Sequence, residues 1–214
     1  MGISALDSSS PLADLTELIA SWPGLVARPD PALVEDSLVL LPHLAGVQTL
    51  IDVGSGGGLP GLALKIARPD LRLTLLEANR RKAAFLVHAC ARLGFAYVVV
   101  EASRAEEAGH DERLREHFEV ATARALAAMP VLAELCLPFV RVGGRLLAMK
   151  AGAEAEARAA EPAIRALGGR LEGVLDAPSA ARTLGQVVVV RKVEATPAEF
   201  PRRAGVPSRR PLGK

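Results

Sequence analysis

The residues best suited to chemistry form a glycine cluster, Asp52-Val-Gly-Ser-Gly-Gly-Gly-Leu-Pro-Gly61, directly after the apolar run Thr49–Val53. Glycine has no Cβ, so it allows tight turns and lets a ligand approach the backbone closely. A loop that joins a strand to a helix at the carboxyl edge of a parallel sheet is where such folds bind ligands. Five glycines in eight positions, from Gly54 to Gly61, therefore predict a cofactor site in preference to a flexible turn.

Two cofactors compete for this loop. From Gly56 onward the residues match the Gly-x-Gly-x-x-Gly fingerprint of dinucleotide-binding folds, whose helix N-terminus faces a pyrophosphate. From Asp52 onward they match the acidic-x-Gly-x-Gly-x-Gly pattern of S-adenosylmethionine enzymes. Pro60 removes an N–H group that a pyrophosphate would use and that a phosphate-free methyl donor does not need. Because Gly56 also comes three residues after Val53, the loop favours S-adenosylmethionine over NAD.

Glu77 ends the apolar run Leu73–Leu76, 23 residues after Gly54. A carboxylate in this place can accept hydrogen bonds from both hydroxyl groups of a ribose. NAD enzymes also place an acid here, so Glu77 argues against NADP without separating NAD from S-adenosylmethionine. The simpler alternative is a solvated acid at a strand end, but its expected position beside the glycine loop favours cofactor binding.

These residues are positioned by strands and helices that alternate from Thr49 onward. Such alternation predicts an α/β fold of the Rossmann-like type, a mostly parallel seven-stranded sheet with helices on both faces. The expected strands are Thr49–Val53, Leu71–Leu76, Tyr97–Val100, Phe118–Thr122, Leu146–Met149, Arg170–Leu175 and Gln186–Val190. The expected helices are Leu62–Ala67, one from the Asn79 cap to Leu93, one around Val131–Leu137, and Ala153–Leu167 with a kink at Pro162.

Three parts are expected along the chain: an N-terminal helical segment over residues 1–48, the Rossmann-like domain over 49–193, and a basic tail over 194–214. In the first part, Ser10-Pro11 opens a helix, and a second helix runs from Pro31 to Leu41, where Pro42 brings it near its end.

The C-terminal region is locally basic although the net charge of the chain is only +2. From Arg191 to Lys214 there are seven Lys or Arg residues, opposed only by Glu194 and Glu199. A local excess of this kind favours a polyanionic partner, and a solvated, frayed tail is the alternative. The candidate RNA contacts within it are Arg202, Arg203, Arg209 and Arg210.

The remaining features of the sequence predict a soluble, cytoplasmic protein. Cys90 and Cys136 show neither CxxC spacing nor a nearby histidine pattern, so we expect free thiols in a reducing compartment and no metal site. No basic segment followed by an apolar run opens the chain, and no stretch has the roughly 20 apolar residues that a bilayer requires. We therefore expect no signal peptide, no membrane association and a monomer.

The glycine loop, with its Leu59-Pro60-Gly61 ending, resembles the signature of the bacterial ribosomal RNA small-subunit methyltransferase G family, also called glucose-inhibited division protein B. The resemblance extends from about Thr49 to the C-terminus. Its further matches are Arg68-Pro69, Leu75–Glu77, Arg81–Leu86, Ser103–Glu107, Ala123–Ala125, Met149-Lys150 and Phe200–Pro207. The N-terminal part departs from the family pattern, since Pro23 follows Trp22 and Leu33 stands where a histidine is expected before Asp36-Ser37-Leu38.

The resemblance implies S-adenosylmethionine-dependent methylation of guanosine N7 in 16S ribosomal RNA of the small subunit. It also implies roles for individual residues. Gly54 and Leu59 would line the cofactor site, Glu77 would hold the ribose, and Ala105 and Glu106 would flank the adenine. Arg124 would lie beside the reaction centre, at the cofactor.

The chemistry of that reaction asks little of the protein, because guanine N7 carries a lone pair and no proton. No general base is required, and the four histidines lie in no triad-like arrangement. Arg124 and Lys150, near strand ends, could hold guanine O6 or a phosphate, or could be structural ion-pair residues. The alternatives are a methyltransferase acting on another RNA, a protein or a small molecule, an NAD-binding oxidoreductase, and a non-catalytic RNA-binding module.

Overall fold

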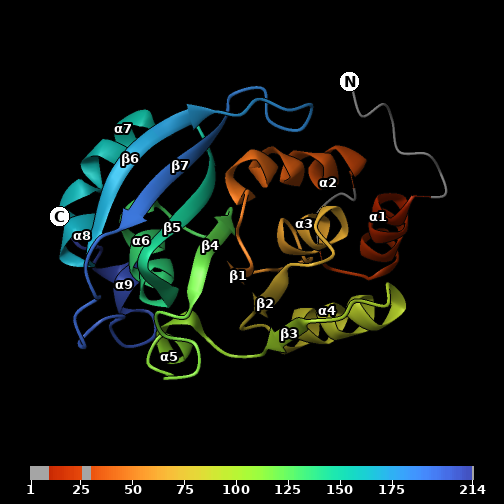
Figure 1. Cartoon of the computed structure of the whole chain (residues 1–214), viewed down its shortest axis with the longest axis horizontal. Coiled ribbons are helices and arrows are strands. Elements are labelled where there is room, and N and C mark those ends of the chain that lie inside the picture. Colours follow the sequence, from red (N-terminus) through yellow and green to blue (C-terminus); the bar gives the residue numbers. More distant parts are fainter. Residues whose placement is uncertain (1–9, 26–29, 214) are drawn as a thin grey trace.

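The computed structural model describes residues 10–25 and 30–213, which are built around a seven-stranded sheet of order β3-β2-β1-β4-β5-β7-β6 (Figure 1). Strands β1 to β5 run parallel, while β7 is antiparallel to both of its neighbours, β5 and β6. The expected α/β class and mostly parallel sheet are confirmed. The strands are β1 Thr49–Val53, β2 Arg72–Leu76, β3 Val98–Glu101, β4 Phe118–Arg124, β5 Val140–Ala151, β6 Gly169–Asp176 and β7 Gly185–Lys192.

Helices cover both faces of this sheet, because each strand alternates its apolar side chains between the two. Leu50 packs in one buried cluster with helices α1 to α4, and its neighbour Ile51 packs in the other with α5 to α8. The first group is α1 Pro11–Ser21, α2 Pro31–Ser37, α3 Gly61–Ala67 and α4 Arg80–Arg92. The second group is α5 Ala105–Ala108, α6 Met129–Cys136, α7 Glu154–Ala159 and α8 Glu161–Ala166, with α9 Val206–Arg209 against α6.

Several expected elements have different limits. The single helix over Ala153–Leu167 is wrong: it breaks at Ala160, and Pro162 stands in the first turn of α8, where its missing N–H costs nothing. The helix expected to reach Leu41 ends at Ser37 and continues as a 3-10 helix over Leu38–Leu44. Strand β5 is much longer than expected, because β7 pairs with it from Arg145 to Ala151.

Both terminal segments pack on the sheet domain. In the N-terminal part Leu15, Ile19 and Val34 are buried with sheet residues in one cluster. Ser10 caps α1 as expected, while the rest of the expected N-terminal segment, residues 1–9 and 26–29, lies outside the described residues. No helix within residues 10–25 and 30–213 is long and apolar enough to cross a bilayer.

The C-terminal segment, residues 194–213, is not a frayed tail. Arg115 donates to the carbonyl oxygens of Thr196 (2.7 Å) and Phe200 (2.8 Å). The Pro201 side chain is buried, and its carbonyl oxygen lies 2.7 Å from His110 Nε2. The segment therefore lies against the domain, beside α5 and α6, as Figure 1 shows at the lower left.

Candidate active site

A cavity of about 300 Å³ opens at the carboxyl edge of the sheet, where β1, β2, β3 and β4 end. This is the edge at which parallel α/β sheets bind ligands, and the volume is that of a small-molecule site. Residues from four consecutive strand ends meet there. The lining residues are Val53, Gly54, Gly56, Leu76, Glu77, Ala78, Lys82, Ser103, Arg104, Ala105, Glu106, Ala125, Leu126 and Leu135.

The glycine loop is fixed to the neighbouring strand β2. The N–H groups of Gly54 and Ser55 both donate to the Leu76 carbonyl oxygen, at 2.8 and 3.1 Å. Gly54 has a φ of +73°, a conformation that a residue with a Cβ adopts only with strain. At the far end of the loop, a Cβ on Gly61 would lie 2.8 Å from Asp52 Oδ2, so only glycine allows the helix to begin so close to β1.

Asp52 lies beneath this loop with its side chain almost fully buried. Its Oδ2 accepts the Gly61 N–H at 3.0 Å, whereas its Oδ1 has no partner among the described residues. Burial raises the pKa of the Asp52 carboxyl to about 7, although the Gly61 hydrogen bond and the charge of Arg124 act in the opposite direction. A buried oxygen that lacks a donor is costly to a fold.

Glu77 is held in place by backbone groups. Its Oε2 accepts the Gly56 N–H at 2.8 Å, and its Oε1 accepts the Asn79 N–H at 2.7 Å. Each carboxylate oxygen retains a further lone pair for a ligand hydroxyl. Because Glu77 also lines the cavity, it can receive a ribose without moving, as the sequence predicts.

The opposite end of the cavity is formed by the segment that follows β3. The Ser103 hydroxyl is buried and has no partner within the described residues. Glu106 Oε1 accepts hydrogen bonds from Arg104 (3.1 Å) and from the Gly205 N–H (2.9 Å) of the C-terminal segment. Burial acts to raise the pKa of Glu106, but these two bonds outweigh it and lower the pKa. Glu106 therefore stays ionised and joins the cavity to the C-terminal segment.

Not every residue predicted for the site lines the cavity. Gly54, Glu77, Ala105 and Glu106 come together there, as expected. Leu59 does not: its side chain is buried in the hydrophobic cluster shared with α3 and α4.

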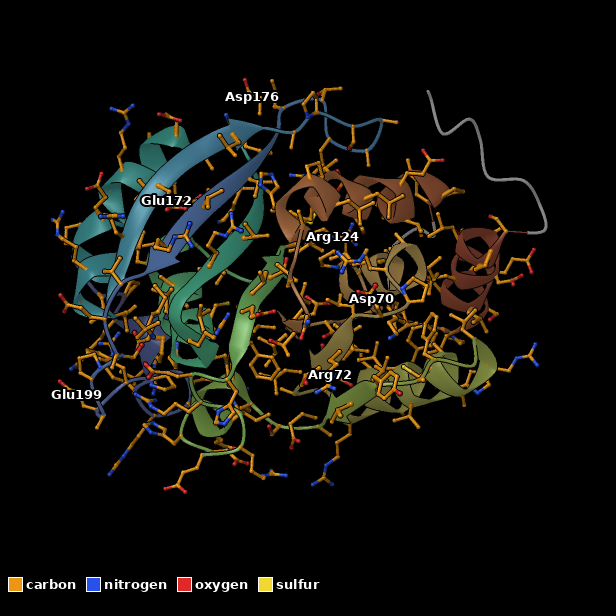
Figure 2. The ribbon with its side chains drawn as sticks, in the orientation of Figure 1. Asp70, Arg72, Arg124, Glu172, Asp176 and Glu199 are labelled. Atoms are coloured by element: carbon orange, nitrogen blue, oxygen red, sulfur yellow. The ribbon has the colours of Figure 1, made fainter. Side chains whose placement is uncertain are left out.

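Arg124 ends β4, but its guanidinium turns toward α2, as Figure 2 shows. It donates to the Leu33 carbonyl oxygen at 2.9 Å and lies 3.7 Å from Asp36 Oδ2. Asp36 is fully buried and also accepts from Arg182 Nε, at 2.9 and 2.8 Å, and from Ser179 at 2.6 Å. Arg124 thus belongs to a charge cluster beside the cavity that joins α2, β4 and the loop between β6 and β7.

Lys150 is likewise engaged within the protein. Its Nζ donates to the Ala127 carbonyl oxygen at 2.8 Å and pairs with Glu156 Oε1 at 2.9 Å. Arg182 donates in turn to the carbonyl oxygen of Lys150. The Lys150 ammonium is therefore directed at the loop after β4 and not into the cavity.

The four C-terminal arginines fall into two kinds. Arg202 makes two side-chain bonds to Glu134, a fully buried carboxylate, at 2.9 and 2.6 Å. Arg203, Arg209 and Arg210 are exposed, and the last two line a hollow beside α9. Three of the four side chains thus face solvent and one serves the fold.

Sequence analysis missed Ser103, Lys82 and Leu126 as lining residues. Ser103 and Leu126 share one signal, namely that each lies two residues after a strand that ends at the same sheet edge as the glycine loop. Lys82 lies in the first turn of α4, after the cap formed by Asn79, and only the folded chain shows that this turn borders the cavity.

The strand order, with the one antiparallel strand β7 next to the edge strand β6, and the glycine loop define the Rossmann-like methyltransferase fold. Solved structures share this fold. A putative O-methyltransferase from Klebsiella pneumoniae aligns with a TM-score of 0.64 at 15% identity, covering 90% of this chain and 92% of that one. The antibiotic-resistance methyltransferase Kmr aligns with a TM-score of 0.57 at 18% identity, covering 73% and 92%.

Sequence comparison identifies the particular family. The model of rRNA small subunit methyltransferase G matches residues 31–184. The ribosomal RNA small subunit methyltransferase G of Moorella thermoacetica is 45% identical over 186 residues, which cover 84% of this chain and 76% of that protein. That of Rubrobacter xylanophilus is 44% identical over 181 residues, covering 82% and 69%. The chain belongs to the rRNA small subunit methyltransferase G family, which confirms the resemblance seen in the sequence.

Proposed function

We propose that this chain transfers the methyl group of S-adenosylmethionine to N7 of a guanosine in 16S ribosomal RNA of the small subunit. The observation that carries the proposal is the cavity itself. The glycine loop and Glu77, a carboxylate able to bind ribose hydroxyls, line the same cavity. The chain that carries this cavity belongs to a ribosomal RNA methyltransferase family. A variant of MtNAS with the same fold (TM-score 0.58, 20% identity, 86% and 72% coverage) was solved in complex with S-adenosylmethionine.

The residues present fit this cofactor. Ser103 Oγ is a buried polar atom at the cavity that lacks a partner within the described part of the chain. S-adenosylmethionine carries an ammonium group, ribose hydroxyls and an adenine, so it offers donors to the Glu77 carboxylate and both donors and acceptors to the Ser103 hydroxyl. It has no phosphate, in keeping with Pro60 at the helix start, where a dinucleotide would need another N–H group.

The cofactor, when bound, supplies an electrophilic methyl group together with its leaving group. The protein then has to bind and align it and to exclude water. Glu77 holds the ribose, the Gly54 backbone allows close approach, and Ala105 with Glu106 borders the adenine. Leu126 covers the apolar wall beside Gly54.

No residue is required to remove a proton, because guanine N7 reacts through its lone pair. Arg124, at the end of β4, remains our candidate for holding the acceptor base, whereas Lys150, which binds Ala127 and Glu156, acts on the loop after β4. Burial lowers the pKa of Arg124, with Asp36 opposing, and arginine nevertheless stays protonated in proteins. It can therefore orient an acceptor but cannot act as a base.

The RNA partner is supported by the basic C-terminal segment. Arg203, Arg209 and Arg210 present exposed positive charge beside α9, and Arg104 extends it to the cavity. These are the residues that we propose to contact ribosomal RNA, whereas Arg202 is engaged with Glu134. We further propose three parts of the chain, over residues 1–48, 49–193 and 194–214, and a monomer that acts in the cytoplasm.

Mapping of modified nucleotides tests the proposal. Ribosomal RNA from cells with and without the gene is compared, and purified protein is then incubated with S-adenosylmethionine and small subunits from the deletion strain. We expect one N7-methylguanosine to be lost on deletion and restored in vitro. Restoration of a different modification, or methylation of protein alone, would contradict the proposal. If the protein binds NAD but does not bind S-adenosylhomocysteine, an oxidoreductase would be favoured.

A further inference from the structure

One wall of the cavity is formed by the β4–α6 loop, residues 125–128. Ala125 and Leu126 of this loop line the cavity. The Leu126 side chain lies directly over Gly54, because a Cβ built on that glycine would be only 2.5 Å from Leu126 Cδ1. The position of the β4–α6 loop therefore sets the shape of the cavity beside the first glycine.

The side chains of this loop can do little to hold it in place. Its sequence is Ala125-Leu126-Ala127-Ala128, so none of its side chains carries a hydrogen-bonding group. Ala125 has a φ of +52°, a conformation that costs free energy in a residue other than glycine. A loop with such a backbone keeps one shape only when its surroundings hold it.

Two charged residues from other elements hold its backbone. Lys150, near the end of β5, donates to the Ala127 carbonyl oxygen at 2.8 Å. Glu156, on α7, accepts the N–H of Met129, the first residue of α6, at 2.7 Å. The two side chains also bind each other at 2.9 Å, which makes them one unit. We call Lys150 and Glu156 the loop clamp, and neither of them lines the cavity.

We propose that Glu156, together with Lys150, is a positioning residue for methyl transfer, acting through the β4–α6 loop and Leu126. This inference rests on the proposed function. An in-line displacement is sensitive to alignment, and a displacement of about 1 Å can cost on the order of 100-fold in rate. The ribose and the adenine contact Glu77 and the segment after β3, which the clamp does not touch. Loss of the clamp therefore lowers the rate while the cofactor remains bound.

The test compares Glu156→Ala, Glu156→Gln and Glu154→Ala. Glu154 lies on the same helix and, among the described residues, pairs only with exposed Arg158, which makes it a matched control. Single-turnover methylation of small subunits is measured with saturating cofactor, and the Kd of S-adenosylhomocysteine is measured by calorimetry. For Glu156→Ala we expect the rate to fall by at least about tenfold, while the Kd of S-adenosylhomocysteine changes by less than about threefold. Glu156→Gln keeps an oxygen for both donors and recovers most of the rate, and Glu154→Ala matches the wild type.

The double variant tests whether the two residues act as one unit. Lys150→Ala and Glu156→Ala should lower the rate to a similar extent, and combining them should add little. A rate within twofold of wild type for Glu156→Ala would overturn the proposal. So would a much larger, additive loss for Lys150→Ala, which would mean that Lys150 contacts the acceptor itself. A wild-type protein that binds the cofactor but does not methylate ribosomal RNA would refute the proposed function instead.

Discussion

At the scale of single residues, Gly54 is restricted in two ways. Its φ of +73° disfavours any Cβ, and Leu126 fills the space that a Cβ would occupy. Gly46 has the same φ, +73°, with nothing within 4 Å of an added Cβ. The chain thus contains a natural control that separates backbone strain from loss of space.

Gly54→Ala should lower the affinity for S-adenosylhomocysteine about tenfold or more, because Leu126 is displaced into the cavity. Gly46→Ala should leave it unchanged, although each variant loses about 1 kcal/mol of stability from its left-handed backbone. Calorimetric titration and urea unfolding measure the two effects. Equal affinities in both variants would show that the loop does not contact the cofactor.

Asp52 predicts a pH dependence of stability. The pKa of Asp52 is about 7 in the folded protein and 3.8 in an unfolded chain, so the folded state binds the proton more tightly than the unfolded state does. The free energy of unfolding therefore decreases as the pH rises from about 4 through 7. Asp52→Asn retains an acceptor for Gly61 but cannot ionise. The difference in free energy of unfolding between the variant and the wild type should grow in favour of the variant by about 2 kcal/mol from pH 5 to pH 8. Urea unfolding without cofactor measures this, and a constant difference across that range would disprove the raised pKa.

At the scale of elements, the C-terminal segment is attached through Arg202. Arg202→Ala leaves the fully buried Glu134 carboxylate without its cation and should cost about 3 kcal/mol. Arg203→Ala removes an exposed side chain and should change stability by less than about 0.5 kcal/mol. Thermal unfolding of both variants compares them. Similar melting temperatures would mean that the Arg202–Glu134 pair does not help to attach the segment.

The elements that could be predicted from the sequence are those with local signals. The strand Thr49–Val53, the glycine loop and the Asn79 cap each depend on neighbouring residues, and all appear as expected. The partners of Arg202 and Arg124 lie 68 and 91 residues away, in Glu134 and Leu33, so no local pattern reveals them.

The same limit applies within the site. Glu77 was predictable because it follows its strand directly, whereas Leu59, three residues beyond Gly56, packs into the core beside α3. Spacing places a residue on an element, but it does not decide which way the side chain faces when both faces of that element are covered.

At the scale of the whole molecule, exposed charge should determine how tightly the RNA is bound. Replacing Arg203, Arg209 and Arg210 by Ala should reduce the slope of log affinity against log salt by about 2 to 3, since each lost phosphate contact contributes about 0.7 to 0.9. The control is Arg72→Ala with Arg92→Ala, two exposed cations on β2 and α4, elements that lie away from α9 in Figure 1. Filter binding over a salt series measures the slopes. An unchanged slope in the triple variant would place the RNA elsewhere.

The charge cluster around Asp36 has a consequence for how the protein is made. Asp36 binds Ser179 and Arg182, which follow it by 143 and 146 residues, whereas the lining of the cavity is complete by Leu135. In a chain still being translated, Arg124 and all the lining residues are therefore synthesised first, and Asp36 gains Ser179 and Arg182 only when the β6–β7 loop has emerged. The Asp36 cluster is therefore completed late in synthesis, after every residue that lines the cavity has been translated.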